Sequence, residues 1–565
     1  MRVLGINAVF HDPAAAVVVD GRVVAAAEEE RFSRRKHGKR CVPFSTWELP
    51  ERAAAWCVAE AGLRFDQIDA IAYSYDPALL PVTTDLETGD FEGLRSWYVR
   101  RAPSFLESAF PGIDGSRTRF VRHHLAHAAS AYLAGPFADC AVIVLDGRGE
   151  TSSYLAGDVE GGAFREIASQ PLPHSLGLRY EELTMHCGFH RSSDEYKVMA
   201  LAAYGKPRFL GALRERWFVR DDGGFDAPAL DLGAFAAPRI AGAAFEDSNA
   251  DLAASVQQRV EEMLLDLARF AHARTGREHL VMAGGVALNC VANARLAREG
   301  PFARVWVQPA AGDAGTALGG ALYVARELGD AVSPVPSAAL GRSWGEAALA
   351  NVLDEARVDY ERPADIAESV AEILAQDGVV AWFQGRSEFG PRALGHRSLL
   401  AHPGPAANLQ RLNEIKGREE FRPVAPMVLE ARAAAIFEGQ LPSPHMLFVH
   451  RVHDGWRERL GAVVHVDGTA RVQTVSDTDE PLVARMLVAF ERRTGLPVVV
   501  NTSFNTAGRP MVDDPRDALE CFGSAPIDAL AIGPFLLRRR AAAAAPAAAA
   551  PAAAAPAAAA SAAAA

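Results

Sequence analysis

Two histidines four residues apart, His123 and His127, are the residues of this chain whose types and spacing most directly predict chemistry. On a helix, that spacing places both imidazoles on one face, about one turn apart. Two imidazoles so placed can bind one divalent metal. No Glu lies between them, so the pattern of a zinc-protease helix is absent. Histidines at this spacing can also cap a helix or line a cleft, and the spacing alone leaves both interpretations open.

Two aspartates follow hydrophobic runs and sit in glycine-rich turns. The run 141–145 ends in Asp146 and Gly147, and a second strand-like run, 305–307, precedes a turn that contains Asp313. A carboxylate at a strand end, beside a turn without side chains, leaves room for a phosphate to approach. Gly284 and Gly285, followed by Asn289, similarly join a strand-like run to a helix and let a ligand lie close to the backbone. These features predict a metal and a nucleotide rather than a metal and a peptide.

Cationic residues gather in the C-terminal half. Residues 382–398 contain three arginines and three glycines, and Lys416, Arg418 and Arg422 follow. The segment 501–505 closes the strand-like run 498–500 with Asn and Ser side chains. Arginine forks bind phosphate in a bidentate manner, and lysine adds a mobile charge. We therefore predict an anion pocket for phosphates, with surface ion pairs as the alternative. No GxxxxGK[ST] loop is present, which excludes an ordinary P-loop.

The elements that must position these residues follow from length and pattern. A chain of 565 residues is too long for one core. A strand, polar turn and hairpin pattern occurs twice, from Asn7 to Gly21 and from Asp146 to Gly161, which predicts a split α/β domain with a cleft. Helices are expected at 51–61, 126–133 and 251–274. We expect a first domain over 1–330, a linker over 331–345 and a second domain over 346–540. Residues 541–565, almost all Ala and Pro, form a low-complexity tail that cannot build a core.

Composition restricts the partners and the compartment. The net charge of −12 gives no support for broad nucleic-acid binding. Six scattered cysteines without a CxxC pair predict buried free thiols in a reducing compartment. No signal-peptide pattern and no apolar run of membrane-spanning length is present. These features predict a cytoplasmic protein with no nucleic-acid or membrane partner, and they predict no particular oligomeric state.

Taken together, these segments resemble the NodU-type O-carbamoyltransferases, which carbamoylate hydroxyls of antibiotics and nodulation oligosaccharides. The resemblance covers about residues 1–537 and rests on 10–12, 28–37, 123–127, 196–202, 283–289, 390–398 and 501–505. It implies an α/β fold with an N-terminal actin–hexokinase-like domain, of the duplicated RNase H type, and a C-terminal YrdC-like α/β domain. Ala200 departs from the family, whose members often carry Gly there.

The resemblance also implies roles. The YrdC-like domain would convert carbamoyl phosphate and ATP into carbamoyl adenylate, and the first domain would transfer the carbamoyl group to a small-molecule hydroxyl. His11 matches a histidine proposed as general base, although it can instead stabilise its turn. The other implied positions are the metal ligands His123, His127, Asp146 and Asp313, with iron as the expected ion. The implied catalytic residues of the anion site are Lys416, Arg422 and Ser503. The implied residues that bind ATP and carbamoyl phosphate are Asn501, Arg392, Arg471, Gly147, Lys197, Gly284, Gly285 and Asn289.

Three other functions compete with this one. An ATP-dependent sugar kinase would share the first domain's superfamily but needs neither the histidine pair nor a YrdC-like partner. A threonylcarbamoyl tRNA-modifying enzyme would share both domain types, but the acidic balance argues against tRNA. A non-enzymatic, ATP-gated binding protein would bind nucleotide without requiring carbamoyl phosphate. Dependence of ATP turnover on carbamoyl phosphate separates all four.

Overall fold

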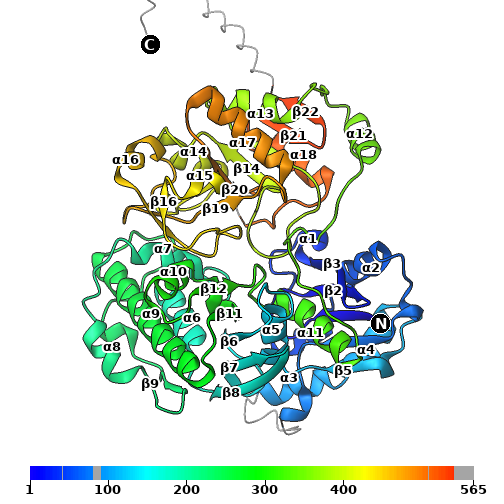
Figure 1. The fold of residues 1–565 in the computed structure, drawn as a ribbon, viewed down its shortest axis with the longest axis vertical. Helices are drawn as coiled ribbons and strands as arrows, with labels where there is room; N and C mark the ends of the chain where they lie inside the picture. The colour runs from blue at the N-terminus through cyan, green and yellow to red at the C-terminus, as the bar shows by residue number, and fades with distance from the viewer. Residues whose placement is uncertain (41, 81–90, 507, 540–565) are drawn as a thin grey trace, which may run out of the picture.

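The computed structural model describes residues 1–40, 42–80, 91–506 and 508–539, which form two α/β lobes. The N-terminal lobe lies below and the C-terminal lobe above in Figure 1. The tail expected at 541–565 and Cys41 lie outside the described residues. The remaining five cysteines are buried free thiols, as expected. Within the described chain, no helix is both long and apolar enough to cross a membrane.

Two five-stranded sheets of the same topology build the N-terminal lobe. Their strand orders are β3-β2-β1-β4-β5 and β8-β7-β6-β11-β12. In each sheet the first three strands of the chain pair antiparallel, and the last two join in parallel. This repeated arrangement confirms the duplication and the mixed α/β fold class. The strands are β1 (Arg2–Asn7), β2 (Ala14–Val19), β3 (Arg22–Glu28), β4 (Ala70–Tyr73), β5 (Thr118–Phe120), β6 (Cys140–Leu145), β7 (Ser152–Glu160), β8 (Ala163–Pro171), β11 (His279–Ala283) and β12 (Arg304–Val307).

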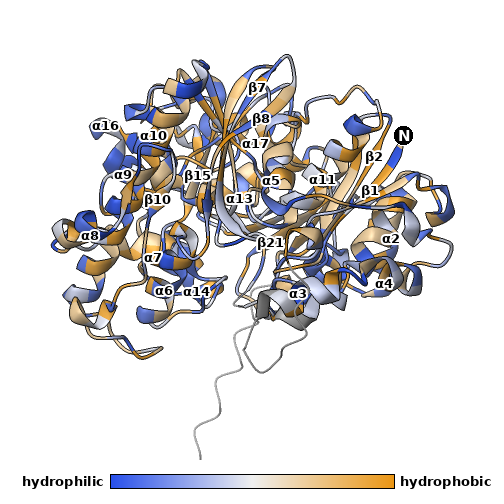
Figure 2. Ribbon diagram, turned by 90° about the horizontal axis from the view of Figure 1, so that it is seen from below, coloured by the Kyte–Doolittle hydropathy of each residue, from blue (hydrophilic) through white to orange (hydrophobic). Residues whose placement is uncertain are grey.

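Both copies contain the hairpin that the sequence predicts. Asp20 and Gly21 join β2 to β3, and Gly161 and Gly162 join β7 to β8. All four residues have positive φ, which two-residue turns matching the twist of paired strands require. The strands β1 and β2 are mostly hydrophobic and buried (Figure 2), because both faces of the sheet are covered.

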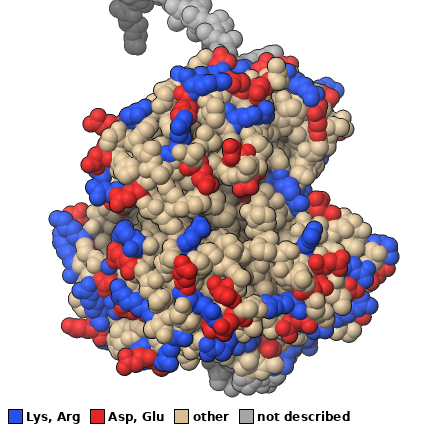
Figure 3. Space-filling view, viewed as in Figure 1, with Lys and Arg blue, Asp and Glu red and all other residues tan. Residues whose placement is uncertain are grey.

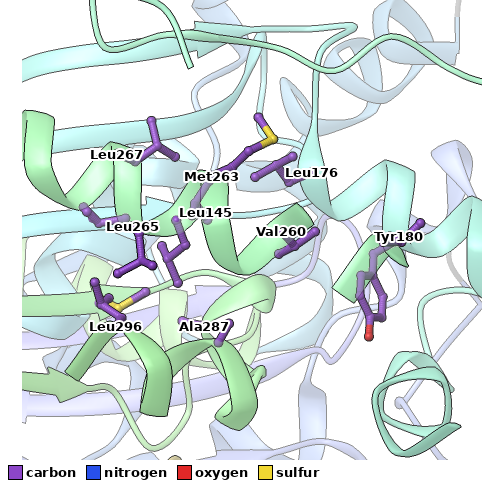
Figure 4. Close-up of a cluster of buried hydrophobic side chains, with 14 of the residues drawn as sticks. Leu145, Leu176, Tyr180, Val260, Met263, Leu265, Leu267, Ala287 and Leu296 are labelled. Carbon is purple, nitrogen blue, oxygen red and sulfur yellow. The ribbon is translucent and has the colours of Figure 1, made fainter. Parts of the chain in front are cut away.

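Helices cover both sheets and hold the strand ends in place. Helix α11 (Ala314–Glu327) packs on α5 (His123–Tyr132), β1 and β2. The long α9 (Asp247–Thr275) covers the second sheet; its Val260 and Met263 belong to the core that also holds Leu145, the last residue of β6 (Figure 4). The predicted helix at 126–133 begins three residues earlier, so that both His123 and His127 are helical. The helices expected at 51–61 and 251–274 correspond to α2 (Glu51–Glu60) and α9.

A seven-stranded mixed sheet forms the C-terminal lobe, in the order β19-β15-β20-β14-β13-β21-β22. One face packs against α13 (Ile366–Ala375) and α17 (Pro481–Thr494), and the other against α12 (Glu346–Glu355), α14 (Ala407–Ile415) and α18 (Pro515–Ser524). The result is a three-layer sandwich. The strands are β13 (Val380–Phe383), β14 (Arg397–Ala401), β15 (Ala425–Leu429), β19 (Gln473–Val475), β20 (Val498–Ser503), β21 (Ala529–Ile532) and β22 (Phe535–Arg538).

Between the lobes, residues 331–345 contain no helix or strand. Two of their backbone N–H groups bond to the first lobe, Ser333 to the carbonyl of Gly21 at 3.1 Å and Val335 to that of Ala134 at 2.9 Å. The expected linker is thus laid along the first lobe. Shorter helices used below are α1 (Glu30–Ser33), α6 (Leu176–His186), α7 (Glu195–Ala202) and α10 (Cys290–Glu299).

Candidate active site

Four candidate metal ligands meet in the interior of the N-terminal lobe. His123 and His127 project from the first turns of α5, Asp146 directly follows β6, and Asp313 immediately precedes α11. The Nε2 atom of His123 lies 3.3 Å from Asp146 Oδ2 and 3.5 Å from Asp313 Oδ1. The Nε2 atom of His127 lies 3.7 Å and 3.5 Å from the same two oxygens. All four side chains are buried.

The donor set of this cluster fits a divalent cation. Ligand atoms that each lie about 2.1 Å from one tetrahedral metal are separated by roughly 3.4 Å, close to the separations found here. Neither ring nitrogen of the buried His127 has a hydrogen-bond partner among the described residues, and buried polar atoms are otherwise nearly always paired. Burial alone would lower the pKa of His123, but hydrogen bonds to Asp146 and Asp313 raise it to about 10. The two carboxylates thus attract positive charge to this point.

His11 faces the cluster from the turn after β1. Its Nε2 atom lies 3.7 Å from Asp313 Oδ2, and its Nδ1 atom lies 3.0 Å from Asp12 Oδ2. The side chain of Asn7, at the end of β1, donates to the carbonyls of His11 and Asp12 at 3.0 and 2.9 Å and so shapes the turn. The imidazole is therefore held beside the candidate metal site.

The glycine-rich segments bring backbone to the same place. Gly284 has φ +91°, and a Cβ there would lie 2.2 Å from the carbonyl oxygen of Leu145, so only glycine fits. Gly285 N–H donates to Asp146 Oδ1 at 2.9 Å. Asn289 caps α10 by accepting from Ala292 N–H at 3.1 Å. Together with Gly147, Gly285 and Asn289 line the cavity described below.

Lys416 is a buried cation of the C-terminal lobe. It ends α14, and its ammonium group donates to Ser503 Oγ at 3.1 Å, to Asn505 Oδ1 at 2.5 Å and to the backbone carbonyl of Ser503. Burial, followed by the charges of Arg418 and Arg422, lowers the pKa of Lys416 well below its ordinary value. The end of β20 and the loop after it thus supply neutral acceptors only, and these do not neutralise the positive charge.

Arginines extend this positive region. Burial and the neighbouring Arg471 lower the pKa of Arg392 to about 9, and burial with Arg422 lowers that of Arg418 to about 9. Within the described residues, Arg392 Nε, Arg418 Nη2 and Arg471 Nε have no hydrogen-bond partner. Arg422 lies over the ring of Tyr196 at 4.6 Å. Half-buried cations that repel one another indicate a site for an anion.

Asn501, on β20, also lines this positive region. Its Nδ2 atom donates to Gln473 Oε1 at 2.6 Å and to the carbonyl of Ala393 at 3.1 Å. Its Oδ1 atom has no hydrogen-bond partner among the described residues. Asn501 therefore keeps an acceptor available beside the arginines.

Lys197 contacts both lobes. It projects from α7 of the N-terminal lobe, and its ammonium group lies 2.8 Å from Glu419 Oε1 of the C-terminal lobe and 3.1 Å from Asp194 Oδ2. Glu419 also lies 3.4 Å from Arg422. The predicted nucleotide-site residue therefore pairs with protein carboxylates where the lobes meet.

One cavity of about 1680 Å³ joins the two groups of residues. It is lined from below by His11, Asp146 and Asp313 and from above by Arg392, Lys416 and Ser503. The surface is hollowed where the lobes meet, and acidic and basic side chains are interspersed around it (Figure 3). The fold thus brings the predicted metal site and the predicted anion site to opposite ends of one space.

Comparison with known proteins gives the family. The profile described as "Carbamoyltransferase N-terminus" matches residues 2–114 and 112–322, and the one described as "Carbamoyltransferase C-terminus" matches residues 371–539. The chain belongs to the carbamoyltransferase family. It is 39% identical over 560 residues to nodulation protein NolNO of Sinorhizobium fredii, covering 95% of this chain and 80% of that protein. It is 41% identical over 441 residues to nodulation protein NolO of Bradyrhizobium diazoefficiens, covering 75% and 79%.

The chain also resembles a more distant solved structure. HypF of T. kodakarensis is 14% identical, with a TM-score of 0.36, and the match covers 58% of this chain and 48% of that one. A likeness this weak supports no functional conclusion. The family assignment of this carbamoyltransferase therefore rests on sequence, and its site rests on its own geometry.

The structure also places residues in the cavity to which no role was assigned from sequence. Arg418 belongs to the cationic run noted there, but its burial beside Arg422 appears only in the fold. Asp12 and His37 lie beside His11, and Glu195 has its pKa raised to about 7 by burial at the same cavity. Asp12 and His37 lie in short polar turns and Glu195 begins α7, so no periodic signal separated them from solvated surface residues.

Proposed function

We propose that this carbamoyltransferase makes carbamoyl adenylate from ATP and carbamoyl phosphate in its C-terminal, YrdC-like lobe and transfers the carbamoyl group to a small-molecule hydroxyl in its N-terminal lobe. The observation that carries the proposal is the single cavity with an anion site at one end and a cation site at the other. An adenylate made at one end can reach the other within the same cavity. Membership in the family favours this function over a sugar kinase or a binding protein.

In the C-terminal lobe, the cations would bind the phosphates of both substrates. Lys416, Arg422 and Arg392 oppose the charge on the phosphates. Ser503 offers a neutral hydroxyl, and Asn501 Oδ1 can accept a hydrogen bond from the NH₂ of the carbamoyl group. One water hydrolyses carbamoyl phosphate to carbamate and orthophosphate. A carbamate oxygen then bonds to the α-phosphorus of ATP, the bond from that phosphorus to the bridging β-phosphate oxygen breaks, and pyrophosphate leaves. Because the site's own carboxylates are few, binding of these anions relieves repulsion among the cations.

In the N-terminal lobe, His123, His127, Asp146 and Asp313 would hold a divalent cation. Iron is the ion that the family resemblance implies, and imidazole with carboxylate is compatible with it. When bound, the cation would offset negative charge on the phosphate of the adenylate. His11 would accept the proton of the acceptor hydroxyl at Nε2 as the hydroxyl oxygen bonds to the carbamoyl carbon. The bond from that carbon to the phosphate oxygen would break, and AMP would leave. The backbone of Gly284 and Gly285 would lie against the nucleotide.

Release of pyrophosphate from ATP tests the function. We expect release in the presence of carbamoyl phosphate and almost none when it is omitted or replaced by acetyl phosphate. Without an acceptor, the expected nucleotide product is the adenylate and the AMP formed from it. Equal ATP turnover without carbamoyl phosphate, or release of ADP in the presence of a sugar, would contradict the proposal and favour a kinase.

A further inference from the structure

A chain of hydrogen bonds leads away from His11 and crosses the cleft of the N-terminal lobe. Asp12 Oδ2 lies 3.0 Å from His11 Nδ1, and Asp12 Oδ1 lies 2.9 Å from His37 Nδ1. His37 Nε2 then lies 2.8 Å from Ser193 Oγ. His11, Asp12 and His37 belong to the half of the lobe built on β1–β5, whereas Ser193 lies in the loop before α7 of the other half. The two halves are thus connected through one carboxylate and one imidazole.

The chemistry of the groups determines where the hydrogens lie. Burial would raise the pKa of Asp12, but the imidazoles of His37 and His11 hold it well below its ordinary value. An ionised carboxylate only accepts hydrogen bonds, so both Nδ1 atoms must carry hydrogen. A neutral imidazole carries one hydrogen, which leaves Nε2 of His11 as its basic nitrogen. That nitrogen is the one facing the candidate metal site, 3.7 Å from Asp313 Oδ2.

The backbone is shaped to hold this arrangement. Asp12 and His37 both have positive φ, +47° and +60°, which residues with side chains rarely adopt. The N–H of His37 donates to Glu30 Oε2 at 2.7 Å, and this bond fixes the loop after α1. Two unusual backbone conformations therefore aim the two imidazoles at a single carboxylate.

We propose that Asp12 and His37 are positioning residues that hold His11 in the tautomer with its hydrogen on Nδ1 and Nε2 facing the acceptor, and that Ser193 completes this support from the opposite half of the cleft. The inference rests on the proposed role of His11 as the base. The proton of the acceptor hydroxyl moves to His11 Nε2 and stays on that imidazole, while Asp12 remains a carboxylate and stabilises the imidazolium. Asp12, His37 and Ser193 thus orient the imidazole of His11. Ser193 can contribute only when the two halves of the lobe are as close as in this structure.

Asp12, Glu30 and His37 also offer three ligand atoms that could surround a cation. The hydrogen-bond network is the better explanation, because both ring nitrogens of His37 already have protein partners. A cation would have to displace the contact between Asp12 and His37. Only a cation site here would add a second bound metal ion, so a measurement of metal content distinguishes the two explanations.

The tautomer can be measured without any acceptor. In zinc-loaded protein with ring-¹⁵N histidine, the signals missing from His11→Asn identify His11. We expect an unprotonated Nε2 and a protonated Nδ1 in the parent protein, and loss of this single tautomer in Asp12→Asn and His37→Phe. A hydrogen on Nε2 of His11 in the parent protein, or an unchanged tautomer in both variants, would overturn the proposal.

Kinetics provide the second measurement, with a neutral oligosaccharide and water as hydroxyl probes. His37→Phe should lower the rate of carbamoyl transfer about 10- to 100-fold, leave the KM of the probe nearly unchanged and leave adenylate formation unchanged. His37→Asn, whose amide can still donate to Asp12, should recover most of the loss. His453→Phe, at an exposed histidine of the other lobe, is the matched control.

Each remaining outcome has a distinct meaning. If His11→Asn transfers at the parental rate, the role of His11 as base fails, whatever His37 does. If His37→Phe loses one equivalent of bound metal while the ion at His123 and His127 is retained, the site holds a cation and the positioning role is overturned. Parental transfer by a folded His37→Phe variant would also overturn it.

Discussion

The two ends of the cavity are both buried and both charged, yet their electrostatics are opposite. At the lower end, two aspartates face two histidines, and hydrogen bonding raises the pKa of His123 to about 10 despite burial. At the upper end, burial and mutual repulsion lower the pKa values of Lys416, Arg392 and Arg418. The lower site favours binding of a positive charge, whereas the upper site disfavours the charged form of its own cationic side chains.

This difference indicates which ligands the two lobes require. A cluster of imidazoles and carboxylates is stabilised by a cation, and a proton can take that place when no metal is bound. A cluster of cations is stabilised by an anion, for which the surrounding serine and asparagine side chains are no substitute. Two ligand charges in two lobes favour two separable half-reactions. Each of the first two variants below should affect only one of these half-reactions.

The largest effect is expected at the lower site. The double variant His123→Ala with His127→Ala removes both imidazoles, so bound divalent metal should fall to near zero. Because a metal supplies several kcal/mol of transition-state stabilisation, transfer should fall by at least about 100-fold. Metal analysis and single-turnover transfer measure this, with His453→Ala as control. Loss of pyrophosphate release in the same variant would contradict the separation of the sites.

The reciprocal variant is Lys416→Ala. It removes one charged donor from the anion site, and hydrogen bonds to charged groups contribute about 1.5–3 kcal/mol. Adenylate formation should therefore fall about 10- to 100-fold, with metal content unchanged. Pyrophosphate release gives the rate, and Lys206→Ala, at an exposed lysine, is the control. A normal rate of adenylate formation would show that Lys416 does not contact the reacting phosphates.

Binding of an anion at the upper site should also stabilise the folded protein, with a smaller effect than those on the two rates. Millimolar pyrophosphate should raise the melting temperature, since a ligand at 100 times its Kd stabilises by about 2.7 kcal/mol and each kcal/mol is worth about 2–4 °C. The increase should be smaller in Arg471→Met, which keeps much of the side chain's length without its charge. Calorimetry in KCl of equal ionic strength is the control. An equal increase in KCl would mean that general screening, rather than a site, is responsible.

The smallest effect is expected from an ion pair of the C-terminal lobe, which should make stability depend on pH. His396 Nε2 lies 3.0 Å from Glu480 Oε1. Burial lowers the pKa of His396, but Glu480 and Glu388 raise it above its ordinary value, against the charge of Arg397. Because the folded pKa is raised, the stability gained should be full below about pH 6.5 and lost as pH rises through the folded pKa.

The difference in free energy of unfolding between the parent protein and Glu480→Gln measures the contribution of this ion pair to stability. It should be at most about 1 kcal/mol at pH 6 and close to zero at pH 9, by chemical denaturation at several pH values. Gln410→Glu, at another solvent-accessible position of the lobe, tests for a general charge effect. A difference that grows with pH would reverse the predicted sign.

The sequence by itself determined the local parts of this protein. The histidine pair lies on one helix because its spacing matches a helical turn, and Asp146 follows a strand because the hydrophobic run ends there. The two hairpins follow from Asp20 with Gly21 and Gly161 with Gly162, since their turns need positive φ. Such features depend on neighbours a few residues away, so their signal lies within a short window.

Only the tertiary structure decided which distant residues meet. Asp313 lies 3.5 Å from His123 because α11 packs on α5 between the duplicated sheets. Arg392 and Arg471 repel each other because separate loops converge at the lobe junction. His37 contacts Ser193, which is 156 residues away. This contact depends on the positive φ of Asp12 and His37 and on the short distance between the two halves of the N-terminal lobe. No periodicity encodes such meetings, because they result from packing the whole chain around its cores.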